Sequence, residues 1–425
     1  MEKQSDSKVN DALDQRAKRV FPGGIYGHQS TGLLPEGFPQ FFDRGEGAYI
    51  WDVDGRRYLD LMCAYGPNLF GYADDAIDAA YVDQLARGDC LTGPGEPMVA
   101  LAEAFVDLVT HADWAIFCKN GTDATTAALT TARAHTGRKT VVLARGAYHG
   151  AAPWITPKKA GVTPEDRANQ ILCDYNDEES LRKAVEKAGD DLAAIFATPF
   201  KHDSFLPQQA VGERYARYAR KVCDDTGALL VIDDVRAGFR LARDCSWSTV
   251  GVEPDLSAWG KCIANGHPLS VLLGSNRARE AASQIYVTGS FWFASAAFAA
   301  GLKTLDRIRS TDYLERIVAL GQRLRDGIDG AAEEAGLGVD QTGPVQMPLI
   351  LMADDPDLRK GFYWCERMLA RSVYSHPWHN MFINAAMTES DIDMAIDAAR
   401  ASFRDLAQNA HSLAPVERLT GLLGS

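Results

Sequence analysis

The sequence of 425 residues lacks the features that mark several common classes of protein. No apolar run reaches about 18 residues, so no membrane-spanning helix is predicted, and the first residues contain no apolar core of a signal peptide. No internal repeat or low-complexity tract is present. The eight cysteines form no CxxC pair and no zinc-ligand spacing. We therefore expect a cytoplasmic protein with reduced, buried thiols and no metal site.

Positive charge is also scarce. The chain has 44 Lys and Arg against 57 Asp and Glu, which gives a net charge of −13. Nucleic acid and anionic membranes repel an acidic protein, so we expect neither as a partner. A cationic small-molecule substrate is compatible with this charge, although net charge does not describe a pocket.

The middle of the chain alternates short apolar segments with amphipathic segments of helical length. This order predicts a mostly parallel sheet that is covered on both faces. Binding sites in such sheets form at the carboxyl ends of the strands. The segments that we expect to form strands are WAIFCKNG, KTVVLARGAYHG, DLAAIFATPF, ALLVIDDV, PDLSAWGK and PLSVLLGS.

Two of these ends carry opposite charges. Asp233 and Asp234 follow the apolar run LLVI, and Lys261 follows DLSAWG, 28 residues after Asp233. A buried lysine tends to lose its proton, and a neutral amine attacks aldehydes. Pyridoxal phosphate requires such a lysine and an anion at its ring nitrogen. A simple buried Lys–Asp ion pair is the alternative interpretation.

Two further strand ends contain residues that suit this cofactor. Asn120, Gly121 and Thr122 lie between a strand and a helix, where backbone N–H groups bind phosphate. An ordinary helix cap has the same residues. Tyr148, in AYHG, can stack on a flat ring or can be an ordinary aromatic residue of a turn.

The order NGTDAT, AYHG, IDDVRAGFR and GK resembles class III aminotransferases, which are pyridoxal-phosphate enzymes of fold type I. The glutamate-1-semialdehyde aminomutases have the similar series SGTEAT, CYHG, FDEVMTGFR and GK. The resemblance covers nearly the whole chain, from RVFPGGIYGH to INAAMTESDID. Its GGIYGH and HPWHNM segments are also similar to aminotransferases of aminoglycoside pathways.

This resemblance implies an α/β fold with a large, mostly parallel-sheet domain and a smaller α+β domain. We expect an N-terminal arm and segment over residues 1–60, the large cofactor-binding domain over 61–310 and the small domain over 311–425. A homodimer with shared active sites is also implied. In it, Ser290, or else Thr288, corresponds to a threonine that reaches the cofactor phosphate of the neighbouring subunit.

The remaining roles are also implied by the resemblance. Lys261 matches the Schiff-base lysine that later carries a proton, and Asp233 matches the acid at the pyridine nitrogen. Tyr65 falls where the aminomutase has a pocket tryptophan. The other implied cofactor-binding residues are Gly121, Thr122, Tyr148, His149 and Val235, with Ala237 as a poorer match than Val235. The expected substrate-binding residues are Tyr65, Tyr26, His28 and His379.

Some positions depart from the family pattern. Ser30 stands where the aminomutase has an arginine for the substrate carboxylate, and a hydroxyl cannot replace a bidentate clamp. Asp234 stands where the family usually has a glutamate after the first acid. Thr198, before Pro199, replaces the glutamate of the family's common Glu-Pro pair. These departures, together with His376, Trp378 and Asn380, favour a polyhydroxylated or polyamine substrate, although neutral drift explains them equally well.

The predicted reaction is therefore transfer of an amino group to or from an amino or oxo sugar, such as the 6′ position of an aminoglycoside intermediate. An epimerase or aminomutase on the same scaffold is the alternative. These reactions differ by a second acid–base group that faces the lysine. The candidates for that group are Cys262, Lys201, His202 and Tyr65.

Overall fold

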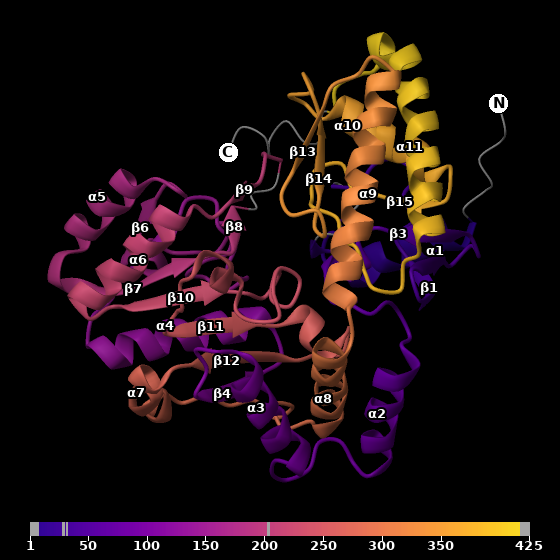
Figure 1. The fold of residues 1–425 in the computed structure, drawn as a ribbon. Helices are drawn as coiled ribbons and strands as arrows, with labels where there is room; N and C mark the ends of the chain where they lie inside the picture. The colour runs from indigo at the N-terminus through magenta and orange to yellow at the C-terminus, as the bar shows by residue number, and fades with distance from the viewer. Residues whose placement is uncertain (1–7, 28–29, 31–32, 202–204, 417–425) are drawn as a thin grey trace.

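The computed structural model describes residues 8–27, 30, 33–201 and 205–416. Its central element is a seven-stranded sheet in the order β4-β12-β11-β10-β7-β5-β6 (Figure 1). Strand β12 is antiparallel to both neighbours, and the other neighbouring pairs are parallel. The expected mostly parallel α/β sheet is therefore confirmed. Its strands are β4 (Trp114–Cys118), β5 (Thr140–Ala144), β6 (Gln170–Cys173), β7 (Leu192–Ala197), β10 (Leu229–Asp233), β11 (Leu256–Trp259) and β12 (Ser270–Gly274).

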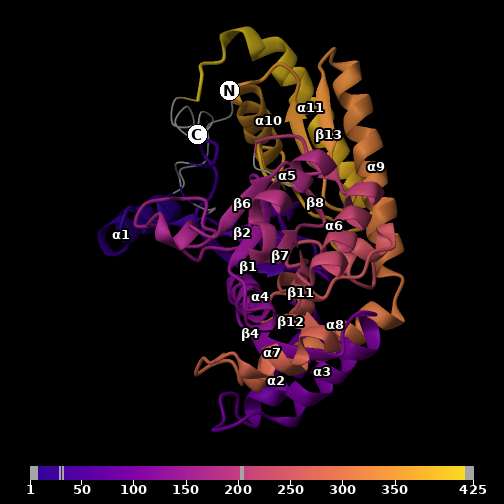
Figure 2. The same ribbon diagram turned by 90° about the vertical axis from the view of Figure 1, so that its left-hand side faces the viewer.

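Helices surround this sheet and form most of the C-terminal part. Helix α1 projects from the rest of the chain in Figure 2, and the Val9 N–H donates to Asp54 Oδ1 at 3.0 Å. No helix in the described ranges is both long and apolar enough to cross a membrane. The helices are α1 (Lys8–Val20), α2 (Asp75–Ala86), α3 (Glu96–Leu108), α4 (Gly121–Thr136), α5 (Glu178–Ala188), α6 (Glu213–Thr226), α7 (Arg279–Gln284), α8 (Ser295–Ser310), α9 (Tyr313–Glu334), α10 (Arg359–Leu369) and α11 (Glu389–Asn409).

Both faces of the large sheet are buried, which explains why its strands are apolar without alternation. Along β10, Leu229 and Val231 belong to a cluster with alanines of α4. Leu230 and Ile232 belong to a different cluster that contains residues of α6. Successive side chains of a strand point to opposite faces. This parity along β10 also decides where the two acids at its end point.

A smaller sheet joins distant parts of the chain. Strands β1 (Phe42–Glu46), β2 (Tyr49–Asp52) and β3 (Arg57–Asp60) form an antiparallel unit, and β15 (Val373–Tyr374) pairs parallel to β3. The N-terminal segment and the C-terminal part therefore share one sheet. The division of the chain near residues 60 and 310 stays a prediction. The remaining strand pairs are β8 (Phe200–Lys201) with β9 (Gln209–Ala210) and β13 (Val339–Thr342) with β14 (Leu349–Met352).

Candidate active site

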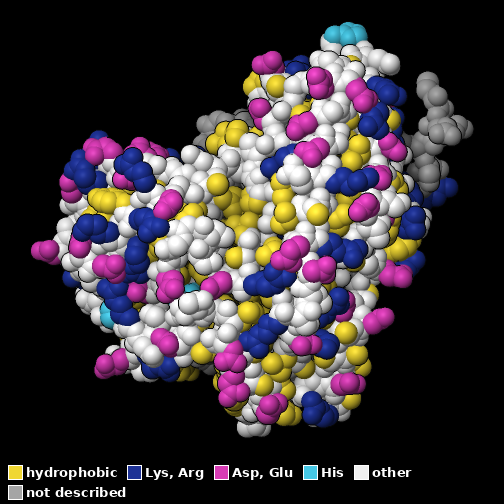
Figure 3. All heavy atoms as spheres, viewed as in Figure 1, with side chains coloured by type: hydrophobic (Ala, Val, Ile, Leu, Met, Phe, Trp, Pro, Cys, Tyr) yellow, Lys and Arg dark blue, Asp and Glu magenta, His cyan; other side chains and the backbone are white. Residues whose placement is uncertain are grey.

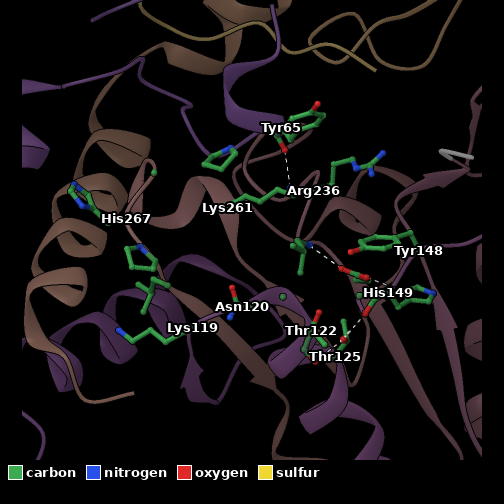
Figure 4. A pocket seen from close by; sticks show the side chains of 18 of the residues that line it. Tyr65, Lys119, Asn120, Thr122, Thr125, Tyr148, His149, Arg236, Lys261 and His267 are labelled. Atoms are coloured by element: carbon green, nitrogen blue, oxygen red, sulfur yellow. Dashed lines mark hydrogen bonds and ion pairs between the residues drawn. The ribbon is translucent and has the colours of Figure 1, made fainter. Parts of the chain in front are cut away.

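A cavity of about 390 Å³ lies at the carboxyl ends of β4, β5, β10 and β11. In Figure 4, Tyr65, Lys261 and Arg236 lie along one side of the cavity, and Asn120, Thr122 and Thr125 lie along the other. The lining residues are Tyr65, Pro67, Lys119, Asn120, Gly121, Thr122, Thr125, Tyr148, His149, Gly150, Asp233, Val235, Arg236, Lys261, Gly266, His267, Pro268, Leu269 and His379.

The two adjacent acids at the end of β10 face different surroundings. Asp233 has the parity of Leu229 and Val231 and lines the cavity, where its Oδ2 lies 2.8 Å from His149 Nδ1. Asp234 has the opposite parity, and its Oδ2 accepts a hydrogen bond from the Ser246 N–H at 2.9 Å. Burial raises the pKa of Asp234 to about 6. Only Asp233 is therefore placed to meet a ligand in the cavity.

Lys261 lies two residues beyond the end of β11, with its amine near the Tyr65 backbone. Its Nζ donates to the Tyr65 carbonyl at 2.8 Å. Burial, followed by the nearby Arg236 cation, lowers the pKa of Lys261 to about 7. A large fraction of this amine is therefore neutral and nucleophilic at neutral pH. Lys261 forms no ion pair with Asp233, so the alternative of a simple Lys–Asp pair is wrong.

The backbone on both sides of this hydrogen bond is left-handed. Lys261 has a φ of 52°, and Cys63, Ala64 and Tyr65 have φ values of 46°, 54° and 64°. Such backbone costs on the order of 1–3 kcal/mol for each non-glycine residue and persists only where the surroundings enforce it. The strain is concentrated where the Tyr65 carbonyl meets the Lys261 amine.

The N-terminus of α4 forms the opposite side of the cavity. Asn120 caps this helix in a capping box with Asp123, and Gly121 is its first residue. A Cβ on Gly121 would lie 2.7 Å from Val235 Cγ1, so the close approach requires glycine. The Thr122 hydroxyl accepts a hydrogen bond from the Ala151 N–H at 3.0 Å. The first N–H groups of a helix have no partner within the helix and favour a phosphate.

The cavity contains residues that sequence reasoning missed. Arg236, Lys119 and His267 line it, and the Arg236 Nη1 donates to Asn380 Oδ1 at 2.9 Å. A signal for Arg236 was present in the sequence, because IDDVRAGFR has arginine where the aminomutase pattern FDEVMTGFR has methionine. His267 stacks on Tyr81, with ring centroids 4.2 Å apart.

Several predicted residues lie elsewhere. Tyr26, Thr288 and Ser290 are exposed and do not line the cavity, and their roles stay predictions. Val235 lines the cavity and Ala237 does not, and the role of Val235 at the ring face stays a prediction. The residues Ser30, Lys201 and Cys262 also lie outside the lining, and the Cys262 thiol donates to the Gly238 carbonyl at 3.0 Å. His28 and His202 lie outside the described residues.

The charge of the cavity is opposite to that of the chain. Lys119 and Arg236 are cations of the lining, Lys261 is only partly protonated at neutral pH, and Asp233 is the one acidic residue of the described lining. On the face shown in Figure 3, acidic and basic side chains are interspersed. The net charge of −13 therefore does not predict the ligands of the cavity. The residues that the structure describes also contain no group of three side chains suited to a metal ion.

These side chains fit pyridoxal phosphate. The cavity offers an amine for the aldehyde, a carboxylate for the ring nitrogen and a helix N-terminus for the phosphate. Gly121 lets the start of α4 pack directly against Val235 at this side of the cavity. The His149 Nε2 is buried and has no hydrogen-bond partner among the described residues, while its Nδ1 is held by Asp233.

Comparison with known proteins agrees with this chemistry. The family Aminotransferase class-III matches residues 35–339. An aminopentol aminotransferase of Sphingopyxis macrogoltabida is 55% identical over 413 residues, which cover 97% of this chain and 98% of that protein. A glutamate-1-semialdehyde 2,1-aminomutase of Deinococcus radiodurans is 31% identical over 434 aligned positions, with coverage of 93% and 96%. The structure of the FumI protein of a Sphingopyxis species, in its PLP internal aldimine form, has a TM-score of 0.96 and 54% identity, with coverage of 97% and 100%.

The chain therefore belongs to the class III aminotransferase family. It is a pyridoxal-phosphate-dependent aminotransferase of fold type I, as the resemblance implied.

Proposed function

We propose that this aminotransferase takes the amino group from a polyhydroxylated amine and transfers it to a small carbonyl acceptor. The observation that carries the proposal is the meeting of the Lys261 amine, the Asp233 carboxylate and the N-terminus of α4 in one cavity. The name of the 55% identical relative, aminopentol aminotransferase, supports an amine with several hydroxyl groups.

Bound pyridoxal phosphate supplies an aldehyde that condenses with amines and a ring that withdraws electrons from the attached carbon. Asp233, which His149 orients, would hold the ring nitrogen protonated. The backbone of Gly121 and the hydroxyl of Thr122 would hold the phosphate. The Nζ of Lys261 would hold the aldehyde end of the cofactor and would accept the proton lost from the amine carbon.

Two further residues of the cavity are assigned to the ring faces. Tyr148 would stack on one face of the ring, and Val235 would contact the other. Both side chains line the cavity, and the pKa of the Tyr148 phenol is raised, mainly by burial.

The substrate side of the cavity presents polar aromatic groups. The rings of Tyr65 and His379 have centroids 5.2 Å apart at an interplanar angle of 87°. Burial raises the pKa of the Tyr65 phenol, so this group stays protonated and able to donate to a substrate hydroxyl. This lining suits a polyol better than a plain hydrocarbon chain.

An aminoglycoside is a less suitable substrate than a polyol with a single amine. Several ammonium groups need carboxylates near them, because buried like charges repel one another. The described lining contains one acid, which is assigned to the cofactor, and it contains the cations Lys119 and Arg236. An amino sugar with one amine remains compatible with this charge.

A homodimer is part of the proposal. Thr288 and Ser290 are exposed and lie outside the lining of their own cavity, so they reach a cofactor phosphate only in another copy. Tyr286 and Phe291, in the same segment, are 91% and 70% exposed. Exposed aromatic residues of this kind favour coverage by a partner subunit. Light scattering of the eluting holoenzyme measures the mass, and a monomer would contradict this part.

The function is tested by adding amines to the holoenzyme without a carbonyl acceptor. Amino polyols with one amine are expected to convert the cofactor to its colourless pyridoxamine form, whereas neamine is expected to react slowly. Solvent deuterium that enters the amine carbon without net transfer would instead indicate an epimerase. Of the four candidate groups for that reaction, Tyr65 lines the cavity, Lys201 and Cys262 do not, and His202 is outside the described residues.

A further inference from the structure

Arg240 is a buried cation that the proposed cofactor chemistry does not use. Its side chain is fully buried, and no carboxylate pairs with it in the part of the chain that the structure describes. The guanidinium donates instead to two backbone carbonyls, from Nη1 to Ile383 and from Nη2 to Gly66, each at 2.8 Å. A buried cation held by carbonyls alone is costly to the fold. Its contribution therefore lies in the two segments that it joins.

Gly66 ends a turn over residues 62–66, here called the 62–66 turn, which also carries the Tyr65 carbonyl. That carbonyl accepts the hydrogen bond from the Lys261 amine. Gly66 has a φ of 111°, and a Cβ there would lie 3.0 Å from Phe382 Cε1 and 3.3 Å from Lys261 Cδ. The 62–66 turn therefore packs against both the stem and the amine of Lys261.

A second buried group, Asp60, holds the beginning of the 62–66 turn. Its Oδ1 accepts the Met62 N–H at 2.7 Å, and its Oδ2 accepts the Tyr72 hydroxyl at 2.6 Å. Met62 has right-handed and Cys63 left-handed backbone, a combination that directs successive N–H groups toward one acceptor. Burial raises the pKa of Asp60, while the Tyr72 hydroxyl and backbone N–H groups of the turn act in the opposite direction. Asp60 therefore fixes the first N–H groups of the turn.

The Tyr65 carbonyl suits the task proposed for Lys261. A neutral amine that donates one N–H to a carbonyl keeps its lone pair for the proton lost from the amine carbon. The ammonium that results still has an N–H for the same carbonyl. A carboxylate in this place would instead stabilise the ammonium and raise the pKa of Lys261. A carbonyl has no net charge, so it orients the amine with little effect of this kind.

We infer that Asp60 and Arg240 are positioning residues for Lys261: they hold the 62–66 turn so that the Tyr65 carbonyl holds the amine whenever it is not attached to the cofactor. Neither Asp60 nor Arg240 lines the cavity, so both act through the turn. Left-handed backbone persists in non-glycine residues only where the surroundings enforce it, and these two buried side chains enforce it from both ends. The inference rests on the proposed attachment of the cofactor to Lys261.

The experiment follows attachment of pyridoxal phosphate to the apoprotein by stopped-flow absorbance as a function of pH. It measures the plateau rate at high pH and the pH midpoint. Arg240→Met is expected to lower the plateau about 100-fold, because a misplacement of about 1 Å has an effect of that size. Arg240 also lowers the pKa of Lys261, so its removal is expected to move the midpoint above pH 7.

Two conservative variants separate position from charge. Arg240→Lys keeps the cation but does not bridge two carbonyls with a rigid fork, so the plateau is expected to fall about tenfold at an unchanged midpoint. Asp60→Asn keeps the size of the side chain but has one acceptor oxygen in place of two. It is expected to lower the plateau about tenfold, again without moving the midpoint.

Arg243→Met is the matched control. Arg243 also follows β10 and donates to two backbone carbonyls, those of Ile308 at 3.2 Å and Thr311 at 2.8 Å, in addition to its ion pair with Glu315. These partners lie outside the 62–66 turn. Arg243→Met is expected to lower thermal stability and to leave the plateau rate and the midpoint of attachment unchanged.

Parent-like plateau rates in Arg240→Lys and Asp60→Asn would overturn the inference. A midpoint of Arg240→Lys that moves toward the ordinary lysine pKa of about 10.4 would overturn it as well, because Arg240 would then only keep water from the amine. If Arg240→Met does not fold, the two conservative variants provide the same comparison. Borohydride reduction and peptide mapping of each variant separate the two proposals. A label on another lysine would overturn the proposed attachment together with this inference, whereas a label on Lys261 with parent-like rates would overturn the inference alone.

Discussion

The cofactor end and the substrate end of the cavity are built from different kinds of backbone. At the cofactor end, Asp233 closes a regular strand and Gly121 begins a regular helix. At the substrate end, Tyr65 lies in a left-handed segment, and His379 and Asn380 lie in an irregular buried segment after β15. Lys261 connects the two ends, because it follows a strand but adopts a left-handed backbone itself.

The difference shows how one scaffold keeps its cofactor while its substrate changes. Strand ends and a helix N-terminus position groups through many backbone hydrogen bonds, so single substitutions shift them little. Loops depend on a few side-chain contacts, such as that between Arg236 and Asn380. Sequence variation at the substrate end therefore changes specificity at a lower cost to the fold.

The largest effect is expected where the two ends meet. Lys261→Ala removes both the cofactor attachment and the proton carrier, so activity is expected to fall about 10⁴-fold or more. Borohydride reduction of the parent holoenzyme followed by peptide mapping is expected to place the label on Lys261. A label on Lys119, the other lysine of the cavity lining, would contradict the assignment.

The next effect compares the two adjacent acids. Asp233→Asn is expected to keep the cofactor but to lower turnover about 100-fold or more, because an amide does not hold the pyridinium charge. Asp234→Asn is the matched control. An amide oxygen still accepts the Ser246 N–H, so activity is expected to stay within a few fold. Near-normal turnover in Asp233→Asn with an inactive Asp234→Asn would reverse the roles.

A third effect tests the close packing at the cofactor end. Gly121→Ala brings a Cβ within 2.7 Å of Val235 Cγ1 and is expected to cost about 1–3 kcal/mol, seen as lower thermal stability and weaker cofactor binding. Adding Val235→Ala removes the clashing methyl groups and is expected to recover part of the loss. Gly330→Ala, in α9 with open space at its Cβ, is the control. Additive losses in the double variant would rule out the clash.

The smallest effect concerns pH. The neutral Lys261 amine attaches the cofactor, so the attachment rate of the apoprotein is expected to rise about tenfold per pH unit below 7 and to level off above it. Arg236→Gln removes a cation and is expected to move the midpoint to higher pH. Asp233→Asn removes an anion and is expected to move it to lower pH. Stopped-flow absorbance measures both midpoints. A lower midpoint in Arg236→Gln or a higher midpoint in Asp233→Asn would contradict the electrostatic account.

Much of the cofactor end was predictable from the sequence because its signals are local. The apolar run before Asp233, the Gly–Thr turn at a helix start and the lysine at a strand end each lie within a few residues. The sequence placed both acids at one strand end, and the resemblance favoured the first. The alternation of side chains along β10 supplies the physical reason, because it directs Asp234 toward Ser246.

The sequence by itself determined the sheet, the cofactor chemistry and the residues at the carboxyl ends of its strands, because strand periodicity and turn chemistry are short-range. Only the tertiary structure decided that the Tyr65 carbonyl meets the Lys261 amine across 196 positions, and that Asn380 orients Arg236 across 144. Contacts between segments this far apart in the sequence form only when the whole chain has folded. The charge inside the cavity followed from the same packing, because it gathers Lys119, Arg236 and the partly protonated Lys261 around one acid in a chain that is acidic as a whole.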